Sequence, residues 1–289
     1  MNHPIRNNNG FTRLDLMAVI AVISLLFFSI LPAAGKSRSG FLNSLCLANK
    51  RLLMQSVLLY ANDNDGWLPP NSDLGDPSPG NAWLFDSTGF LPSATNALYF
   101  NSPRYSALAP YLGGNIAPFK CPADKNQLKS GLTVATSLRS VSMNCAVGTA
   151  RSFFGAQIAK EATPGGWLDG KHTHGANRDF YCYGRVSDVV NPKPSALWVM
   201  VDEAPDTMND ACFGFVGPGL VTGLVDRPAS FHDAGAGFGF MDGHAEIKFW
   251  MDRRTTTVVP LSSLPQIQAG NPDLEWLGQH GTAPVPKNP

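Results

Sequence analysis

The sequence predicts an α+β fold in which a long N-terminal helix packs on an antiparallel β-sheet with long Pro/Gly-rich loops. Three observations carry this prediction. Residues 16–34 contain no charged residue, an apolar helical period continues as far as Tyr60, and several later segments are rich in β-branched and aromatic residues. The 28 glycines and 23 prolines indicate many turns and irregular connections between these elements.

The uncharged run from Leu16 to Ala34 predicts a membrane-spanning helix. A helix rises about 1.5 Å per residue, so a run of this length is sufficient to cross a hydrocarbon core of about 30 Å. Residues 1–10 form a short polar leader, and residues 11–34 are the expected transmembrane and assembly half of the helix. A plain signal anchor is the alternative, but such an anchor requires neither Gly10 before Phe11 nor an acid at Asp15.

Residues 35–62 are expected to continue the helix as an amphipathic half. Apolar residues recur there at helical spacing, which predicts one stripe facing a globular domain at residues 63–289. The stripe consists of Leu42, Leu45, Cys46, Asn49, Leu52, Leu53, Ser56, Leu59 and Tyr60. Short polar residues at 62–65, followed by Gly66, are typical of a helix end.

The Asp242-Gly243 pair lies between two alternating segments and predicts a β-hairpin. In the expected register Phe240 faces Ala245 and Phe238 faces Ile247, which gives one apolar face. His244, Glu246 and Lys248 are then expected on the opposite face.

The order Gly10-Phe11, Asp15 and Pro32 resembles the type IV prepilin segment. The resemblance implies that a prepilin peptidase cuts after Gly10 and that the new amino terminus, Phe11, is methylated. It also implies assembly through the helix, with Asp15 meeting an amine of a neighbouring pilin-like subunit and Pro32 kinking the helix. This chain differs from the usual family pattern in having Asp15 in place of glutamate and Arg13 in place of an apolar residue.

Further residues along the chain resemble a bacterial family of pilin-like proteins in which this segment precedes a domain marked by His, nine residues and Asp-Gly. Here that pattern is His232 followed by Asp242-Gly243. The resemblance implies a pseudopilin or minor pilin of a type II secretion or type IV pilus-like system. The expected location is the bacterial inner membrane, with a single span and a globular domain that is periplasmic or lies in an extracellular filament.

A metal site is a second hypothesis for the same region. His232, Asp242 and His244 are ligand types, and the predicted strand that ends at Asp202-Glu203 is expected to lie nearby. A structural histidine that holds a loop is the alternative for His232, and no other cofactor is expected. Of the five cysteines, Cys46 and Cys121 are the preferred disulfide pair.

The composition and the remaining motifs do not indicate an enzyme or a nucleic-acid partner. The formal net charge is zero, charged residues make up 15% of the chain, and no basic patch is present. No Gly-x-Ser-x-Gly nucleophile motif occurs. Two hypotheses therefore remain: a non-enzymatic pilin-like subunit, and a membrane-anchored periplasmic metal-binding module or enzyme that uses the prepilin segment as an anchor.

Overall fold

The structure of the chain is a computed structural model that describes residues 12–71, 82–85, 94–130, 133–151, 158–171, 179–221, 223–258 and 264–287. Of residues 26–38, 128–130, 133, 151, 158 and 159 only the backbone is described. The chain divides into two compact units, Met1–Leu42 and Asn43–Pro289, and each is treated separately. Helix α1 (Arg13–Asp63) contributes to both units.

In the first unit, α1 begins with a capping box. The backbone N–H and the hydroxyl of Thr12 donate to Asp15 Oδ2 at 2.8 and 2.7 Å, and the N–H of Asp15 donates to Thr12 Oγ1 at 3.3 Å. These bonds satisfy donors that the first helical turn leaves without an intrahelical partner. Apolar side chains on residues 14–25 are exposed, including Leu14, Met17 and Leu25.

The prediction of a membrane-spanning helix is wrong. Among the described residues, no helix is long and apolar enough to cross a membrane. A crossing requires about 20 consecutive, mostly apolar residues. At the start of α1 the described side chains run from Arg13 to Leu25, a stretch shorter than that. The expected single-pass location in the bacterial inner membrane is wrong for the same reason.

The second unit is built around a five-stranded sheet of order β10-β9-β6-β3-β7. Its strands are β3 (Val141–Asn144), β6 (Trp198–Asp202), β7 (Cys212–Phe213), β9 (Gly235–Phe240) and β10 (Ala245–Phe249). Strand β7 pairs in parallel with β3, whereas the other pairs are antiparallel. The sheet is therefore mixed, which corrects the antiparallel sheet of the predicted fold class.

Small elements surround this sheet. Two-stranded antiparallel ladders are formed by β1 (Leu128–Ser130) with β2 (Thr133–Ala135), β4 (Thr149–Arg151) with β5 (Ile158–Ala162), and β8 (Gly223–Leu224) with β11 (Gln266–Ile267). The short helices are α3 (Leu98–Asn101), α4 (Ala109–Leu112), η1 (Ala117–Phe119), η2 (Val186–Asp188) and α5 (Arg253–Thr256). A longer helix, α6 (Pro272–Gly281), follows near the end of the chain. It is capped by Asn271, whose Oδ1 accepts from the N–H groups of Asp273 and Leu274.

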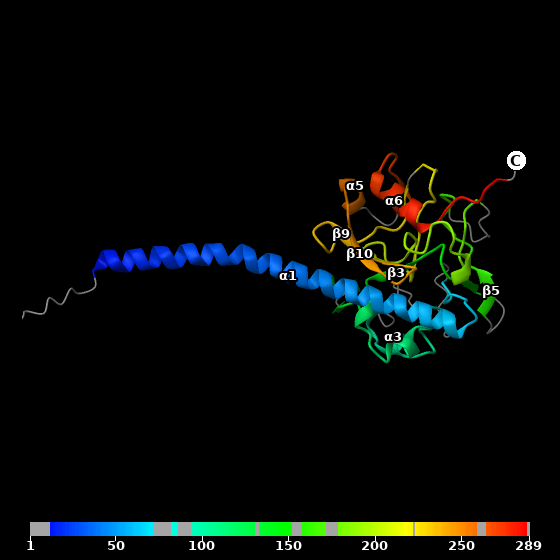
Figure 1. The fold of residues 1–289 in the computed structure, drawn as a ribbon, viewed down its shortest axis with the longest axis horizontal. Helices are drawn as coiled ribbons and strands as arrows, with labels where there is room; N and C mark the ends of the chain where they lie inside the picture. Colours follow the sequence, from blue (N-terminus) through cyan, green and yellow to red (C-terminus); the bar gives the residue numbers. More distant parts are fainter. Residues whose placement is uncertain are drawn as a thin grey trace, which may run out of the picture. The chain divides into compact units, whose positions relative to one another are not determined.

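Within the second unit, the sheet lies between the end of α1 and α6 (Figure 1). On the α1 side, Leu53, Met54 and Val57 join the core formed by Val141, Met143 and other buried residues. On the other side, Trp198, Phe238 and Trp250 pack with Leu274 and Leu277 of α6. The buried side of α1 thus includes Cys46, Lys50, Leu53, Met54 and Val57, whereas Leu45, Leu52 and Leu59 of the predicted stripe are exposed.

The predicted hairpin exists, but its register is wrong by one residue. Ala245 pairs with Gly239 and Ile247 pairs with Gly237, because the loop has three residues and ends at Gly243, whose φ is +92°. A three-residue loop that ends in a left-handed glycine is a common alternative to the two-residue turn. The shift places Ala245 and Ile247 on the face of Gly239 and Gly237, and it places Glu246 and Lys248 on the face of Phe238, so the predicted division into an apolar and a polar face is wrong. Gly237 and Gly239 face α1, where a Cβ at either position would lie 2.7 Å from a side-chain atom of α1.

Candidate functional site

The residues implied by the prepilin resemblance lie at the start of the chain. Gly10 and Phe11 fall outside the described residues. Asp15 is exposed and takes part in the Thr12 capping box. Pro32 lies within α1, where the structure describes only the backbone. The proposed roles of these four residues in processing and assembly stay predictions.

The residues of the predicted metal site are not brought together as expected. Asp242 and His244 lie at the hairpin turn, where Asp242 Oδ1 is 2.6 Å from His244 Nδ1 and accepts from the His244 N–H at 3.1 Å. The His244 ring stacks on Phe240, with ring centroids 4.3 Å apart. His232 precedes the opposite end of β9, and a strand of that length separates the two ends by roughly 17 Å. Asp242 and His244 are therefore local partners in the turn.

His232 instead belongs to a buried cluster with Cys46, Cys121 and Asp202. One ligand atom from each of the four residues lies within 4.8 Å of every other. His232 Nε2 is 3.1 Å from Cys121 Sγ, and Cys46 Sγ is 3.3 Å from Asp202 Oδ2. All four residues are buried. We call these four residues the CCDH cluster.

Four separate segments contribute to the CCDH cluster. Cys46 lies on the buried side of α1, and Cys121 follows η1, where its N–H donates to Ser140 Oγ at 2.8 Å. Asp202 is the last residue of β6. His232 is in the turn before β9, where the next two residues have positive φ values and the His232 N–H donates to the Gly235 carbonyl at 3.2 Å. The cluster therefore depends on long-range packing.

Asn43 determines the tautomer of His232. His232 Nδ1 lies 2.8 Å from Asn43 Oδ1, and an amide oxygen only accepts hydrogen bonds. Nδ1 must therefore carry the proton and donate it to Asn43, which leaves a lone pair on Nε2. The Cys121 thiol then donates to Nε2, and the Cys46 thiol donates to Asp202 Oδ2.

A buried cation neutralises the carboxylate of the cluster. Lys50, one helical turn after Cys46, places Nζ 2.5 Å from Asp202 Oδ1. Burial alone lowers the pKa of Lys50, but the charge of the Asp202 carboxylate and its hydrogen bond outweigh that effect, so the pKa is raised and the lysine is charged. Gly237 also holds this carboxylate, because its N–H donates to Asp202 Oδ2 at 3.1 Å.

The thiol of Cys46 is held in its protonated form. A hydrogen bond with Cys121, burial and the negative charge of Asp202 all raise its pKa above the ordinary value. Such a thiol is a poor nucleophile, because the thiolate is the reactive form. The arrangement therefore does not favour nucleophilic catalysis by Cys46.

The preferred disulfide pair of the sequence analysis is close in space but present as free thiols. Cys46 and Cys121 both belong to the CCDH cluster, and Cys145 and Cys182 are also free thiols. The sequence analysis considered Cys46 and Cys121 only as a disulfide and did not connect them with His232. Lys50 and Asn43 were missed. The position of Lys50, four residues after Cys46 and so on the same face of the helix, could have shown that the two residues lie together.

A second buried polar cluster lies beyond the end of β6, next to Asp202. Glu203 accepts hydrogen bonds from the hydroxyls of Ser142 and Thr207, and Arg139 donates to Ser142 Oγ at 2.7 Å. Burial raises the pKa of Glu203 to about 8, although Arg139 and the bond from Ser142 act in the opposite direction. These contacts join β3 to the segment after β6.

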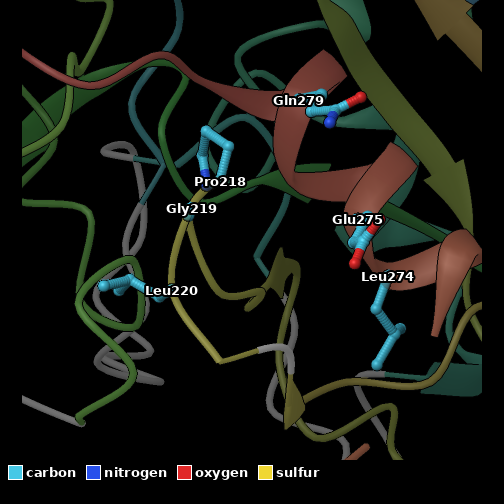
Figure 2. Close-up of a pocket in the computed structure, with 7 residues that line it drawn as sticks. Pro218, Gly219, Leu220, Leu274, Glu275 and Gln279 are labelled. Atoms are coloured by element: carbon cyan, nitrogen blue, oxygen red, sulfur yellow. The ribbon is translucent and has the colours of Figure 1, made fainter. Parts of the chain in front are cut away.

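The structure also has a surface pocket of about 330 Å³ next to α6. Pro218, Gly219 and Leu220 line one side of it, and Leu274, Glu275 and Gln279 of α6 line the other (Figure 2). Glu275 is the single charged residue among those that line it, so the pocket lacks the paired groups that acid–base catalysis uses. It is separate from the CCDH cluster.

Comparison with known proteins gives one informative similarity. The chain is 34% identical to competence protein ComGC of Halalkalibacterium halodurans over 73 residues, which are 25% of this chain and 71% of the relative. No protein-family profile and no solved structure matches the chain. Because the match at this identity covers more than two thirds of the relative, the chain belongs to the family of competence protein ComGC.

Proposed function

We propose that the chain is a pilin-like structural subunit of a competence or type IV pilus-like system, which assembles with other pilin-like subunits through α1. Two lines of evidence support the proposal: the family relationship to a competence protein, and the order of Gly10, Phe11, Asp15 and Pro32. The narrower assignment, to a type II secretion pseudopilin or a minor pilin, rests on the sequence resemblance alone. The proposed role is structural and not enzymatic.

The observation that carries the proposal is the exposed apolar surface at the start of α1. Leu14 is 78% exposed, and Met17 and Leu25 are each 68% exposed. Contiguous exposed apolar residues mark interaction surfaces, because burying them in a partner releases ordered or poorly bonded water. Packing against the equivalent helices of other subunits would bury these side chains.

Processing at the N-terminus would prepare this surface for assembly. In the proposed sequence a prepilin peptidase hydrolyses the Gly10–Phe11 peptide bond, which leaves a free amine on Phe11 that is then methylated. The Asp15 carboxylate is exposed, and Asp15 is four residues after Phe11 in the sequence. An amine from a neighbouring subunit would compete with Thr12 for Asp15 during assembly.

Processing is tested by intact-mass and N-terminal peptide mass spectrometry of the protein expressed with its native peptidase. We expect a mature chain that begins at methylated Phe11, and we expect Gly10→Ala to retain the leader. Asn9→Ala is the matched control and should be processed normally. If Gly10→Ala and the wild type have the same N-terminus, the processing proposal is wrong.

Assembly is tested by cross-linking between subunits in the same cells. Asp15→Ala should reduce cross-linked species. Asp65→Ala, which removes an exposed acid just past the end of α1, should not. Equal cross-linking of Asp15→Ala and wild type would contradict the role of Asp15. If the chain is not processed but subunits still cross-link, the proposed assembly stands and the proposed cleavage by a peptidase is wrong.

A further inference from the structure

We propose that Cys46, Cys121, Asp202 and His232 bind one Zn²⁺ ion in a closed, tetrahedral structural site. This inference is independent of the assembly role, because it rests on contacts within the unit Asn43–Pro289. It also replaces the ligand set expected from the sequence, since Asp242 and His244 have no part in it.

The spacing of the ligand atoms fits a four-coordinate zinc ion. With Zn–S bonds of about 2.3 Å and Zn–N or Zn–O bonds of about 2.1 Å, neighbouring ligand atoms of a tetrahedron lie about 3.5–3.8 Å apart. In the CCDH cluster the Cys121–His232 and Cys46–Asp202 edges measure 3.1 and 3.3 Å. No ligand atom is more than 4.8 Å from another. Side-chain adjustments of less than about 1 Å would therefore suffice.

Each of the two thiol hydrogen bonds in the CCDH cluster joins two atoms that can ligate a metal ion. The Cys121 thiol donates to His232 Nε2, and the Cys46 thiol donates to Asp202 Oδ2. Both acceptors are metal-ligating atoms. Binding would replace the two thiol protons by one Zn²⁺, with both protons released to solvent. The formal charge of the buried site would stay unchanged, so Lys50 would still neutralise Asp202.

Residues around the cluster already provide the outer shell that a zinc site requires. A ligating histidine usually donates its other ring N–H to an oxygen, which orients the ring and fixes the tautomer. Asn43 Oδ1 accepts this bond from His232. Lys50 and the Gly237 N–H hold the Asp202 carboxylate, and Ser140 Oγ accepts from the Cys121 N–H.

A metal explains the cluster better than a disulfide between Cys46 and Cys121 would. Oxidation would remove both S–H donors and leave His232 Nε2 buried without its present donor. A buried polar atom that lacks a partner costs about 1–3 kcal/mol. Zinc, in contrast, would engage all four ligand atoms at once.

The burial of all four ligands indicates a structural and not a catalytic ion. Catalytic zinc sites keep one coordination position open to water or substrate, whereas structural sites are closed by four protein ligands. The ion would connect α1, the loop after η1, the end of β6 and the turn before β9. We infer that it fastens this part of the helix to its globular unit.

The first test measures zinc binding by the wild-type chain, because the result then does not depend on whether a variant folds. The full-length chain is purified under reducing conditions, freed of metal and titrated with Zn²⁺. We expect one tightly bound equivalent, a higher melting temperature, and an X-ray absorption spectrum with two sulfur and two nitrogen or oxygen neighbours. A folded chain that binds no zinc, or a Cys46–Cys121 disulfide that persists under these conditions, would overturn the proposal.

Matched variants identify the ligands. Cys121→Ser, Asp202→Asn and His232→Ala should each weaken zinc binding at least about tenfold, as loss of a ligand or its support does. Their controls, Cys182→Ser, Asp242→Asn and His244→Ala, should bind as the wild type does. Cobalt substitution provides a second measurement, because thiolate-to-Co²⁺ absorption of the saturated chain should fall to that of one thiolate in Cys121→Ser and stay at that of two thiolates in Cys182→Ser. If the control histidine and aspartate variants lose zinc while the CCDH variants retain it, the ion lies at the hairpin and this assignment is wrong.

Discussion

Lys50 Nζ lies 2.5 Å from Asp202 Oδ1, and both side chains are removed from solvent. This pair joins α1 to the last residue of β6, which is the central strand of the sheet. Two charges in a protein interior stabilise the fold only if both remain, because each has lost its hydration. The pair therefore makes the attachment of the helix sensitive to single substitutions.

Lys50→Met should destabilise the chain by about 3–5 kcal/mol, because it leaves the Asp202 carboxylate buried without its cation. Denaturant unfolding of the full-length chain, followed by tryptophan fluorescence, measures the change. Lys160→Met is the control, since Lys160 and its partner Asp65 are largely exposed and 3.9 Å apart. We expect that control to change stability by no more than about 0.5 kcal/mol. Equal stability of the two variants would refute the importance of the buried pair.

Gly237→Ala should destabilise the chain by about 1–3 kcal/mol through overpacking. A Cβ at this position would lie 2.7 Å from both Asp202 Oδ2 and Cys46 Sγ, so the sheet or α1 must shift. Gly223→Ala, at another strand glycine, is the control, because a Cβ at that position would lie 3.5 Å from the Val216 side chain, an ordinary van der Waals distance. Thermal unfolding compares the two. A Gly237→Ala chain with wild-type stability would show that the helix does not approach β9 this closely.

The stability of the chain should fall as the pH rises from about 4.5 to about 8. The pKa of Glu203 is raised from 4.5 to about 8 in the folded chain, so the folded state holds a proton that the unfolded state releases in this range. The free energy of unfolding then decreases by at most about 1.4 kcal/mol per pH unit from this group.

Urea unfolding at several pH values measures this slope. Glu203→Gln should reduce it, because the amide does not titrate; Asp226, whose pKa is also raised by burial, should account for the slope that remains. Glu246→Gln, a change at an exposed position on β10, should leave the slope unchanged. A slope in Glu203→Gln equal to that of the wild type would show that Glu203 does not contribute to it.

Asn43→Ala should weaken zinc binding about 10–100-fold while leaving all four proposed ligands in place. Asn43 accepts the Nδ1 proton of His232, and without that bond the ring is free to rotate or to change tautomer. Competition with a chelator measures the affinity. Asn62→Ala, near the end of the same helix, is the control. Unchanged affinity in Asn43→Ala would exclude it as the positioning residue for His232.

Local sequence determined several elements of this protein. The end of α1 at Asp63, before Asn64–Gly66, and the hairpin at Asp242-Gly243 follow from residues that favour particular backbone angles over a few positions. The hairpin register did not follow, because two- and three-residue loops are both compatible with an Asp-Gly pair. The sequence also indicated His232 as a candidate residue and expected Asp202 nearby, which the structure confirms, but it added Asp242 and His244, which lie at the other end of β9.

Only the tertiary structure decided what surrounds His232. Cys46, Cys121 and Asp202 are distant in sequence, and their meeting depends on how α1, the loop after η1 and β6 pack together. Periodicity predicts that a helix has a buried face, but not which atoms that face meets. The glycines that face α1 on β9 allow the helix to approach closely, and the buried charge of Lys50 is stable there because Asp202 lies opposite it. Short-range backbone preferences therefore specified the elements, and long-range packing specified the site.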